Sequence, residues 1–156
     1  MERISSAGAL HRGDLCLVTG GAGFIGSNLT HALVDRGMRV RVFDDLSTGR
    51  LVNLEGLEGD LDVVQGDVRD AEEMLAATRG CSVVFHEAAI PSVARSVADP
   101  VATNDVNVDG TLNVLMAARD VGVRRVVFAS SSSVYGNTSV LPAHEDLPCR
   151  PISPYG

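Results

Sequence analysis

A glycine-rich turn between an apolar run and a helical pattern is the feature that most constrains the fold of this chain. The apolar run 15–18 has no polar alternation, which is typical of a parallel strand buried on both faces. Gly20, Gly23 and Gly26 then recur at every third residue. In such a turn the first glycine permits a tight bend, the second lets a pyrophosphate approach the backbone, and the third lets helix and strand pack closely. The pattern predicts a dinucleotide site whose phosphates face the free N–H groups of the next helix.

Downstream of this turn, strand patterns and helix patterns alternate along the chain. Strands are predicted at 39–43, 60–66, 82–86 and 123–129, the last of them β-branched and buried. Helical spacing predicts one helix after the turn, which would bury Ile25, Leu29, Ala32 and Leu33, and further helices over 71–78 and 101–121. This order predicts an α/β fold, a Rossmann-type doubly wound parallel sheet. Because no sixth strand follows, we expect a C-terminally incomplete sheet, with residues 1–13 as a flexible leader, 14–156 as one domain and no substrate domain.

The composition argues against several classes of function. The 156 residues carry a formal net charge of −7 and no cluster of basic residues, so we expect no nucleic-acid partner. No apolar run is long enough to span a bilayer, and the first residues lack the apolar core of a secretory signal, so we expect a cytoplasmic protein with no membrane partner. Cys16, Cys81 and Cys149 have no paired spacing, so we expect no disulfide and no metal site.

Asp44 ends the second predicted strand, about 20 residues after the glycine-rich turn. A carboxylate at this place can bind the adenosine ribose hydroxyls of a dinucleotide and repel a 2′-phosphate, which favours NAD over NADP. The alternative is a solvated acid in a loop. Two other polar residues have structural interpretations. Asp70 would cap the helix that begins at Ala71, and His86 would form hydrogen bonds at a strand end rather than act as a base or metal ligand.

Five segments occur in the order and spacing of the extended short-chain dehydrogenase/reductase superfamily. They are TGGAGFIG at 19–26, DDLSTG at 44–49, GDVRD at 66–70, HEAA at 86–89 and NVDGT at 107–111. From about residue 15 to its end the chain resembles the nucleotide-sugar epimerases and dehydratases of that superfamily. The resemblance implies NAD as the cofactor, with the pyrophosphate at the turn, the ribose at Asp44 and the adenine at Asp67. The cofactor-binding residues that it implies are Gly20, Gly23, Phe24, Ile25, Gly26, Asp44, Asp45, Ser47, Thr48, Gly49, Asp67, Val68, Ala88, Ala89 and Asn107.

The resemblance also implies catalytic and substrate-binding residues. Ser131 matches the family's catalytic Ser/Thr, and Tyr155 matches its catalytic tyrosine, while the lysine of the tyrosine motif would come after Gly156. Ser92, Ser132 and Ser133 would contact the sugar. Dehydratases of the family have Asp-Glu where this chain has Ser132 and Ser133. Serines cannot supply the additional acid and base that elimination of water requires, so the resemblance favours an epimerase.

The sequence is therefore interpreted as the cofactor-binding portion of an NAD-dependent nucleotide-sugar 4-epimerase. The greatest similarity is to UDP-glucose and UDP-N-acetylglucosamine 4-epimerases, which act through transient oxidation to a 4-keto sugar. The resemblance implies a homodimeric parent enzyme, and we expect this portion to be inactive by itself. Other interpretations stay open: a dehydratase, a uronate epimerase or decarboxylase of the same family, or a non-catalytic NAD-binding module.

Overall fold

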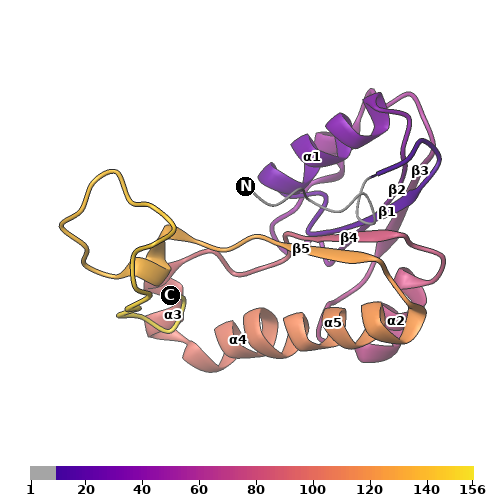
Figure 1. Ribbon diagram of the computed structural model, residues 1–156. Coiled ribbons are helices and arrows are strands. Elements are labelled where there is room, and N and C mark those ends of the chain that lie inside the picture. The colour runs from indigo at the N-terminus through magenta and orange to yellow at the C-terminus, as the bar shows by residue number, and fades with distance from the viewer. Residues whose placement is uncertain (1–9) are drawn as a thin grey trace.

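The computed structural model describes residues 10–156, which form a five-stranded parallel sheet flanked by helices (Figure 1). The strand order is β3-β2-β1-β4-β5. This arrangement confirms the predicted α/β class and the parallel sheet. The strands are β1 (Leu15–Thr19), β2 (Arg39–Asp44), β3 (Leu61–Gln65), β4 (Val83–His86) and β5 (Arg125–Phe128).

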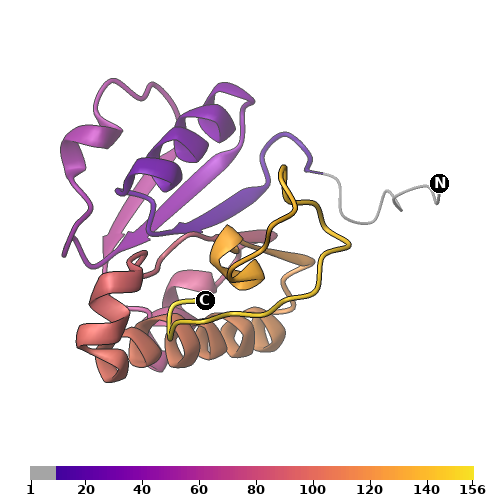
Figure 2. The ribbon, with the colours of Figure 1, turned by 90° about the vertical axis from the view of Figure 1, so that its left-hand side faces the viewer.

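Helices cover both faces of the sheet, as a doubly wound fold requires. Figures 1 and 2 show α1 on one side of the sheet and α2 and α5 on the other. The predicted helix over 101–121 is a continuous run of α4, a π-helical turn and α5. The helical segments are α1 (Phe24–Asp35), η2 (Leu51–Leu54), α2 (Ala71–Thr78), α3 (Val93–Ala98), α4 (Pro100–Asn104), η3 (Asp105–Asp109), α5 (Gly110–Val121) and η4 (Ser132–Tyr135).

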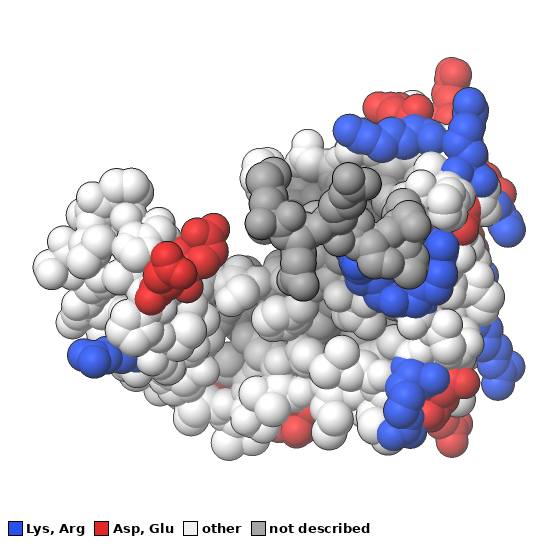
Figure 3. Space-filling view, in the orientation of Figure 1, with Lys and Arg blue, Asp and Glu red and all other residues white. Residues whose placement is uncertain are grey.

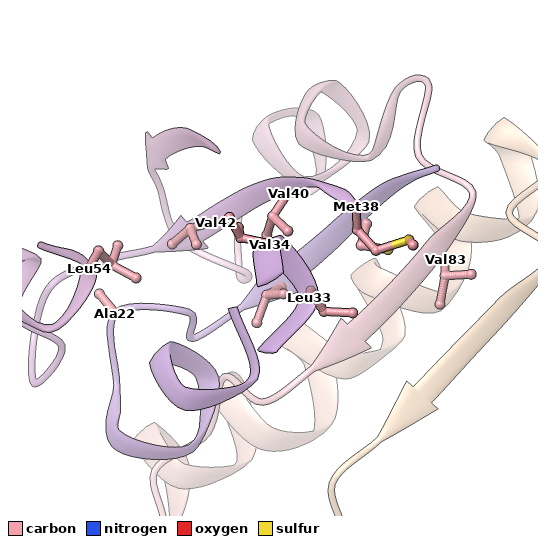
Figure 4. Close-up of a cluster of buried hydrophobic side chains, with 10 residues drawn as sticks. Ala22, Leu33, Val34, Met38, Val40, Val42, Leu54 and Val83 are labelled. Atoms are coloured by element: carbon pink, nitrogen blue, oxygen red, sulfur yellow. The ribbon is translucent and has the colours of Figure 1, made fainter. Parts of the chain in front are cut away.

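Two apolar clusters fill the space between the sheet and its helices, because successive strand residues point to opposite faces. In β1, Cys16 and Val18 face α1, whereas Leu17 faces α2 and α5. Figure 4 shows the cluster under α1, with Leu33 and Val34 against β2. All three β1 side chains are fully buried, which confirms that Cys16 is a core residue. The strand register also brings the carboxyl ends of the strands level, since Thr19 pairs with Phe43 on one side and with His86 on the other.

The local predictions at helix ends hold. The Asp70 carboxylate caps α2 by accepting hydrogen bonds from the N–H groups of Glu72 and Glu73, at 2.9 and 3.0 Å. Gly37 follows the last residues of α1, and Gly122 ends α5 in the left-handed region with a φ of 80°.

Two predictions about packing are wrong. Ile25 is 62% exposed, because the buried stripe of α1 is displaced by one residue and consists of Gly26, Ser27, Thr30, Leu33 and Val34. β5 is mostly exposed, with Phe128 at 56%, because it is the edge strand of the described sheet and only its α5 side is covered. The predicted flexible leader lies outside the described residues up to position 9. Its remaining part is anchored, since Gly13 N–H donates to Gly37 C=O at 3.1 Å.

Candidate functional site

A cleft of about 510 Å³ lies across the carboxyl ends of β1, β2, β3 and β4. Its size is within the range of small-molecule and cofactor sites. The topology favours this position, because β2 and β4 lie on opposite sides of β1, and doubly wound sheets bind ligands where the strand order reverses. The lining residues are Gly20, Gly23, Phe24, Ile25, Gly26, Phe43, Asp44, Asp45, Ser47, Thr48, Gly49, Gly66, Asp67, Val68, Arg69, Glu87, Ala88, Ala89, Ile90, Pro91, Arg95, Ala102 and Val106.

The structure therefore brings together every cofactor-binding residue that the sequence predicts except Asn107. Asn107 lies in η3, behind the cleft wall, and its side chain bonds the backbone of Ile90 instead of facing the cleft. In the structure its side chain holds a lining residue, and its part in cofactor binding stays a prediction.

The glycine turn, residues 20–26, has the geometry of a phosphate cradle. Gly20 has a φ of +66°, and a Cβ there would lie 2.7 Å from the backbone nitrogen of Ala88. A Cβ on Gly26 would lie 2.2 Å from Gly20 O, so this glycine is needed for α1 to pack on the turn. A Cβ on Gly23 would meet only Gly20 O, at 3.1 Å, so its remaining surroundings are open cleft. A pyrophosphate would fill the space on this open side, so the shape of the turn fits the pyrophosphate of a dinucleotide.

Asp44 connects the glycine turn to the loop after β2. Its Oδ2 accepts a hydrogen bond from Ala22 N–H and its Oδ1 accepts one from Leu46 N–H, each at 2.9 Å. The carboxylate is 7% exposed, and a Cβ on Gly49 would lie 2.6 Å from Oδ1. Because each carboxylate oxygen can accept more than one hydrogen bond, both keep acceptor capacity toward the cleft that they line. Asp44 is a buried lining acid with two structural partners, and the alternative of a solvated loop acid is wrong.

Asp67 and Arg69 form a close ion pair at the β3 end of the cleft. The Arg69 guanidinium donates to both Asp67 oxygens, with Nε at 3.0 and 2.9 Å and Nη2 at 2.5 Å. These hydrogen bonds lower the pKa of the Asp67 carboxyl and raise the pKa of Arg69. The backbone of this loop is fixed from α5, because Asn113 Nδ2 donates to the carbonyls of Val68 and Arg69, both at 3.0 Å.

The opposite wall of the cleft follows β4. Glu87 lies there with Ala88 and Ala89, and burial raises the pKa of its carboxyl. His86, one residue earlier, is 2% exposed, and burial lowers its pKa to about 4. It bonds Thr19 Oγ1 through Nδ1 at 2.7 Å and Thr111 Oγ1 through Nε2 at 2.9 Å. This environment agrees with the prediction of a hydrogen-bonding residue at a strand end.

The predicted catalytic and substrate-binding residues do not line the cleft. Ser131 Oγ caps η4 by accepting from Ser133 N–H at 3.2 Å, and Ser92 Oγ caps α3 by accepting from Arg95 N–H at 3.2 Å. After η4 the chain returns to α3, where the C-terminus lies (Figure 1). There the backbone N–H of Tyr155 donates to Ser96 Oγ at 3.1 Å.

Some lining residues were not selected from the sequence. Arg69 and Glu87 lie inside GDVRD and HEAA, two of the segments that carry the family resemblance. Their position in those segments could have predicted that they line the cleft. Arg95 lies on α3, a six-residue helix that was not predicted from the sequence. Two cations and four acids thus line the cleft: Arg69, Arg95, Asp44, Asp45, Asp67 and Glu87.

Neither the charges on the face seen in Figure 3 nor the metal-ligating side chains of residues 10–156 add a competing site. Arginines in Figure 3 are interspersed with acidic residues along the edges of the visible face. Within residues 10–156, no group of His, Cys, Asp and Glu side chains has a metal-binding arrangement. No helix in the same part of the chain is long and apolar enough to cross a bilayer.

Comparison with known proteins shows the family of this chain. Residues 16–156 match the model of the NAD dependent epimerase/dehydratase family. A UDP-glucose 4-epimerase of Mycolicibacterium smegmatis is 48% identical over 143 residues, which cover 89% of this chain and 46% of that protein.

Two solved structures have similar folds. One is a UDP-N-acetylglucosamine 4-epimerase from Methanobrevibacter ruminantium in complex with UDP-N-acetylmuramic acid, with a TM-score of 0.86 and 36% identity, covering 93% of this chain and 46% of that one. The other is a UDP-glucose 4-epimerase from Thermus thermophilus in complex with NAD, with a TM-score of 0.84 and 43% identity, covering 90% and 46%. The chain thus spans less than half the length of these proteins.

Proposed function

Because this chain belongs to the NAD dependent epimerase/dehydratase family, we propose that residues 14–156 form the NAD-binding domain of a UDP-hexose or UDP-N-acetylhexosamine 4-epimerase. The carrying observation is the cleft itself. Segments after β1, β2, β3 and β4 line it together with residues of α3, α4 and η3, and the glycine turn lies between an acid at the end of β2 and a small-residue wall after β4. This arrangement has the shape and donor set that a dinucleotide needs.

The proposed cofactor contacts follow from the lining. Backbone N–H groups at the start of α1 would bind the pyrophosphate, with Gly23 leaving the approach open. Asp44 would accept hydrogen bonds from the adenosine ribose hydroxyls. Its charge would repel a 2′-phosphate, which selects NAD over NADP. Because Arg69 already occupies both oxygens of Asp67, an adenine amino group would have to share that carboxylate with the guanidinium. Ala88 and Ala89 would line the nicotinamide side.

NAD, when bound, supplies a reversible hydride acceptor for the sugar. The chain's own contribution to the chemistry would come from Ser131 and Tyr155, whose hydroxyls would hold and transfer the proton of the sugar 4-hydroxyl. Ser132 and Ser133 would contact the sugar, and neither can act as the additional acid or base of a dehydratase. The parent enzyme would be a homodimer, as the resemblance implies, and its location would be cytoplasmic.

One observation favours a second candidate function. Ser131 caps η4 and Tyr155 lies at α3, so neither hydroxyl-bearing residue lines the cleft in the described chain. A module that binds NAD without catalysis would show this arrangement. The two functions share the cleft and differ only in sugar turnover.

Turnover of UDP-glucose in the presence of NAD distinguishes these candidates. We expect the parent protein to form UDP-galactose without added reductant, as measured by NMR of the sugar products. Tyr155→Phe should abolish the conversion and leave NAD affinity within about twofold, because it removes only a hydroxyl outside the cleft. A 4-keto-6-deoxy product would indicate a dehydratase instead, and NAD binding with no product from either UDP-glucose or UDP-N-acetylglucosamine would indicate the non-catalytic module.

A further inference from the structure

Three polar side chains that the proposed function does not use are linked by hydrogen bonds behind the cleft; Thr19 and His86 are buried and Thr111 is half-buried. Thr19 ends β1, His86 ends β4 and Thr111 lies in the first turn of α5. The Thr19 Oγ1 to His86 Nδ1 distance is 2.7 Å, and the His86 Nε2 to Thr111 Oγ1 distance is 2.9 Å. None of the three lines the cleft. His86 is also packed by the ring of Phe128, at a centroid distance of 5.7 Å.

The donor and the acceptor of each hydrogen bond in this series of side chains can be assigned. Thr111 Oγ1 lies 2.7 Å from the carbonyl of Asn107, which can only accept, so the single hydroxyl proton of Thr111 is donated there. Thr111 Oγ1 must therefore accept from His86, which places the imidazole proton on Nε2. In the neutral ring Nδ1 is then an acceptor, and Thr19 donates its hydroxyl proton to it. Thr19 Oγ1 in turn accepts from Ala88 N–H at 3.3 Å.

Both ends of this series of hydrogen bonds lie at the same wall of the cleft. One end holds Ala88 through Thr19. At the other end, Asn107 Oδ1 accepts from Ile90 N–H at 2.8 Å, and Asn107 Nδ2 donates to Ile90 C=O at 3.3 Å. Together with the backbone of residues 88–90, these hydrogen bonds form a closed ring, and residues 88–90 all line the cleft. Asn107 lies in the π-helical turn η3, a local distortion that often marks functional sites.

We infer that this closed ring of hydrogen bonds positions residues 88–90 against the cofactor and holds His86 as the neutral tautomer with its proton on Nε2. Thr111, His86 and Thr19 act as positioning residues, because they reach the cleft only through the backbone of Ala88 and Ile90. The expected effect on cofactor affinity rests on the proposed function, whereas the tautomer of His86 does not. Burial, which lowers the pKa of His86 to about 4, agrees with a neutral ring at physiological pH.

The tautomer is tested directly on the unmodified chain. Two-bond ¹H–¹⁵N correlation spectra of the imidazole distinguish a protonated from an unprotonated ring nitrogen, with or without NAD. We expect His86 to show a protonated Nε2 and an unprotonated Nδ1 at neutral pH. A proton on Nδ1, a charged ring or an exchanging mixture of tautomers would overturn the inference.

Substitutions at Thr111 test the positioning role. Thr111→Val keeps the shape of the side chain but removes the acceptor for Nε2–H and the donor to Asn107, and we expect it to weaken NAD binding about tenfold by calorimetry. Thr111→Ser restores the hydroxyl and should bind within about threefold of the original chain. The matched control is Thr78→Val in α2, where a fully buried hydroxyl also donates four residues back, at 2.8 Å, but contacts no part of the ring.

The outcomes separate this inference from the proposed function. Weaker NAD binding in Thr111→Val, with recovery in Thr111→Ser and no change in Thr78→Val, supports the positioning role. Equal NAD affinity in Thr111→Val and Thr78→Val overturns it. If the unmodified chain binds no NAD, the proposed function and the positioning role both fail, while the spectra still decide the tautomer. If Thr111→Val does not fold, Thr111→Ala removes the same hydroxyl and takes its place in the comparison with Thr111→Ser, and the spectra of the unmodified chain still decide the tautomer.

Discussion

Gly26→Ala is expected to lower the free energy of unfolding of this chain by about 3 kcal/mol. The added Cβ would lie 2.2 Å from Gly20 O and 2.7 Å from Gly21 Cα. Both are backbone atoms of the turn, so neither can move aside without displacing α1 from β1. The better helix propensity of alanine returns only about 1 kcal/mol, so the clash dominates. Urea denaturation measures the change.

The matched variant is Gly23→Ala, three residues earlier in the same turn. Its Cβ would meet only Gly20 O, at 3.1 Å, so the unfolding free energy should change by less than about 1 kcal/mol. The same methyl group would occupy the open side of the turn, and we expect NAD affinity to fall at least about tenfold. A Gly26→Ala protein as stable as the original would contradict the packing role of Gly26. A Gly23→Ala protein with unchanged NAD affinity would contradict a pyrophosphate at the turn.

Acidification is expected to destabilise the chain through His86. The pKa of His86 is about 4 in the folded chain and 6.5 in the unfolded chain, so the unfolded state binds more protons between these values. The contribution of the neutral His86 ring to the free energy of unfolding is therefore fully present above pH 6.5 and is lost as the pH falls toward 4. The pKa difference corresponds to about 3 kcal/mol.

The measurement compares urea denaturation of the original chain and of His86→Gln between pH 6.5 and pH 4. Glutamine keeps one donor and one acceptor but does not titrate, so we expect the original chain to lose about 3 kcal/mol more than the variant. Glu87, whose raised pKa gives the opposite dependence on pH, is present in both proteins and cancels in the comparison. Parallel pH profiles for the two proteins would show that His86 is not buried as a neutral ring.

The parts of the site that could be predicted are those set by local backbone requirements. Gly20 needs a positive φ, Gly26 needs a missing Cβ, and Asp44 follows a strand at a fixed distance from both. Such requirements are visible in the sequence because one residue type satisfies them. The sheet could be predicted for the same reason, since buried parallel strands are short apolar runs between turns.

The parts that could not be predicted depend on tertiary packing. Ile25 has the helical spacing of a core residue, but the close approach of α1 to the glycine turn rotates Gly26 and Thr30 inward instead. The run 123–129 is apolar enough for a central strand, and only the strand order shows that β5 lies at an edge. The ring through His86 joins residues as far apart in the sequence as Thr19 and Thr111, and no local pattern encodes it.

Calorimetric titration with NAD and with NADP tests directly whether the cleft is an NAD site. We expect saturable binding of NAD and weaker binding of NADP. The difference in affinity between the two dinucleotides should be smaller in Asp44→Asn, which removes the charge but keeps an acceptor. Equal binding of both dinucleotides by the original chain, or an unchanged preference in Asp44→Asn, would contradict the assignment of Asp44. Binding of neither would contradict the claim that this cleft is an NAD site.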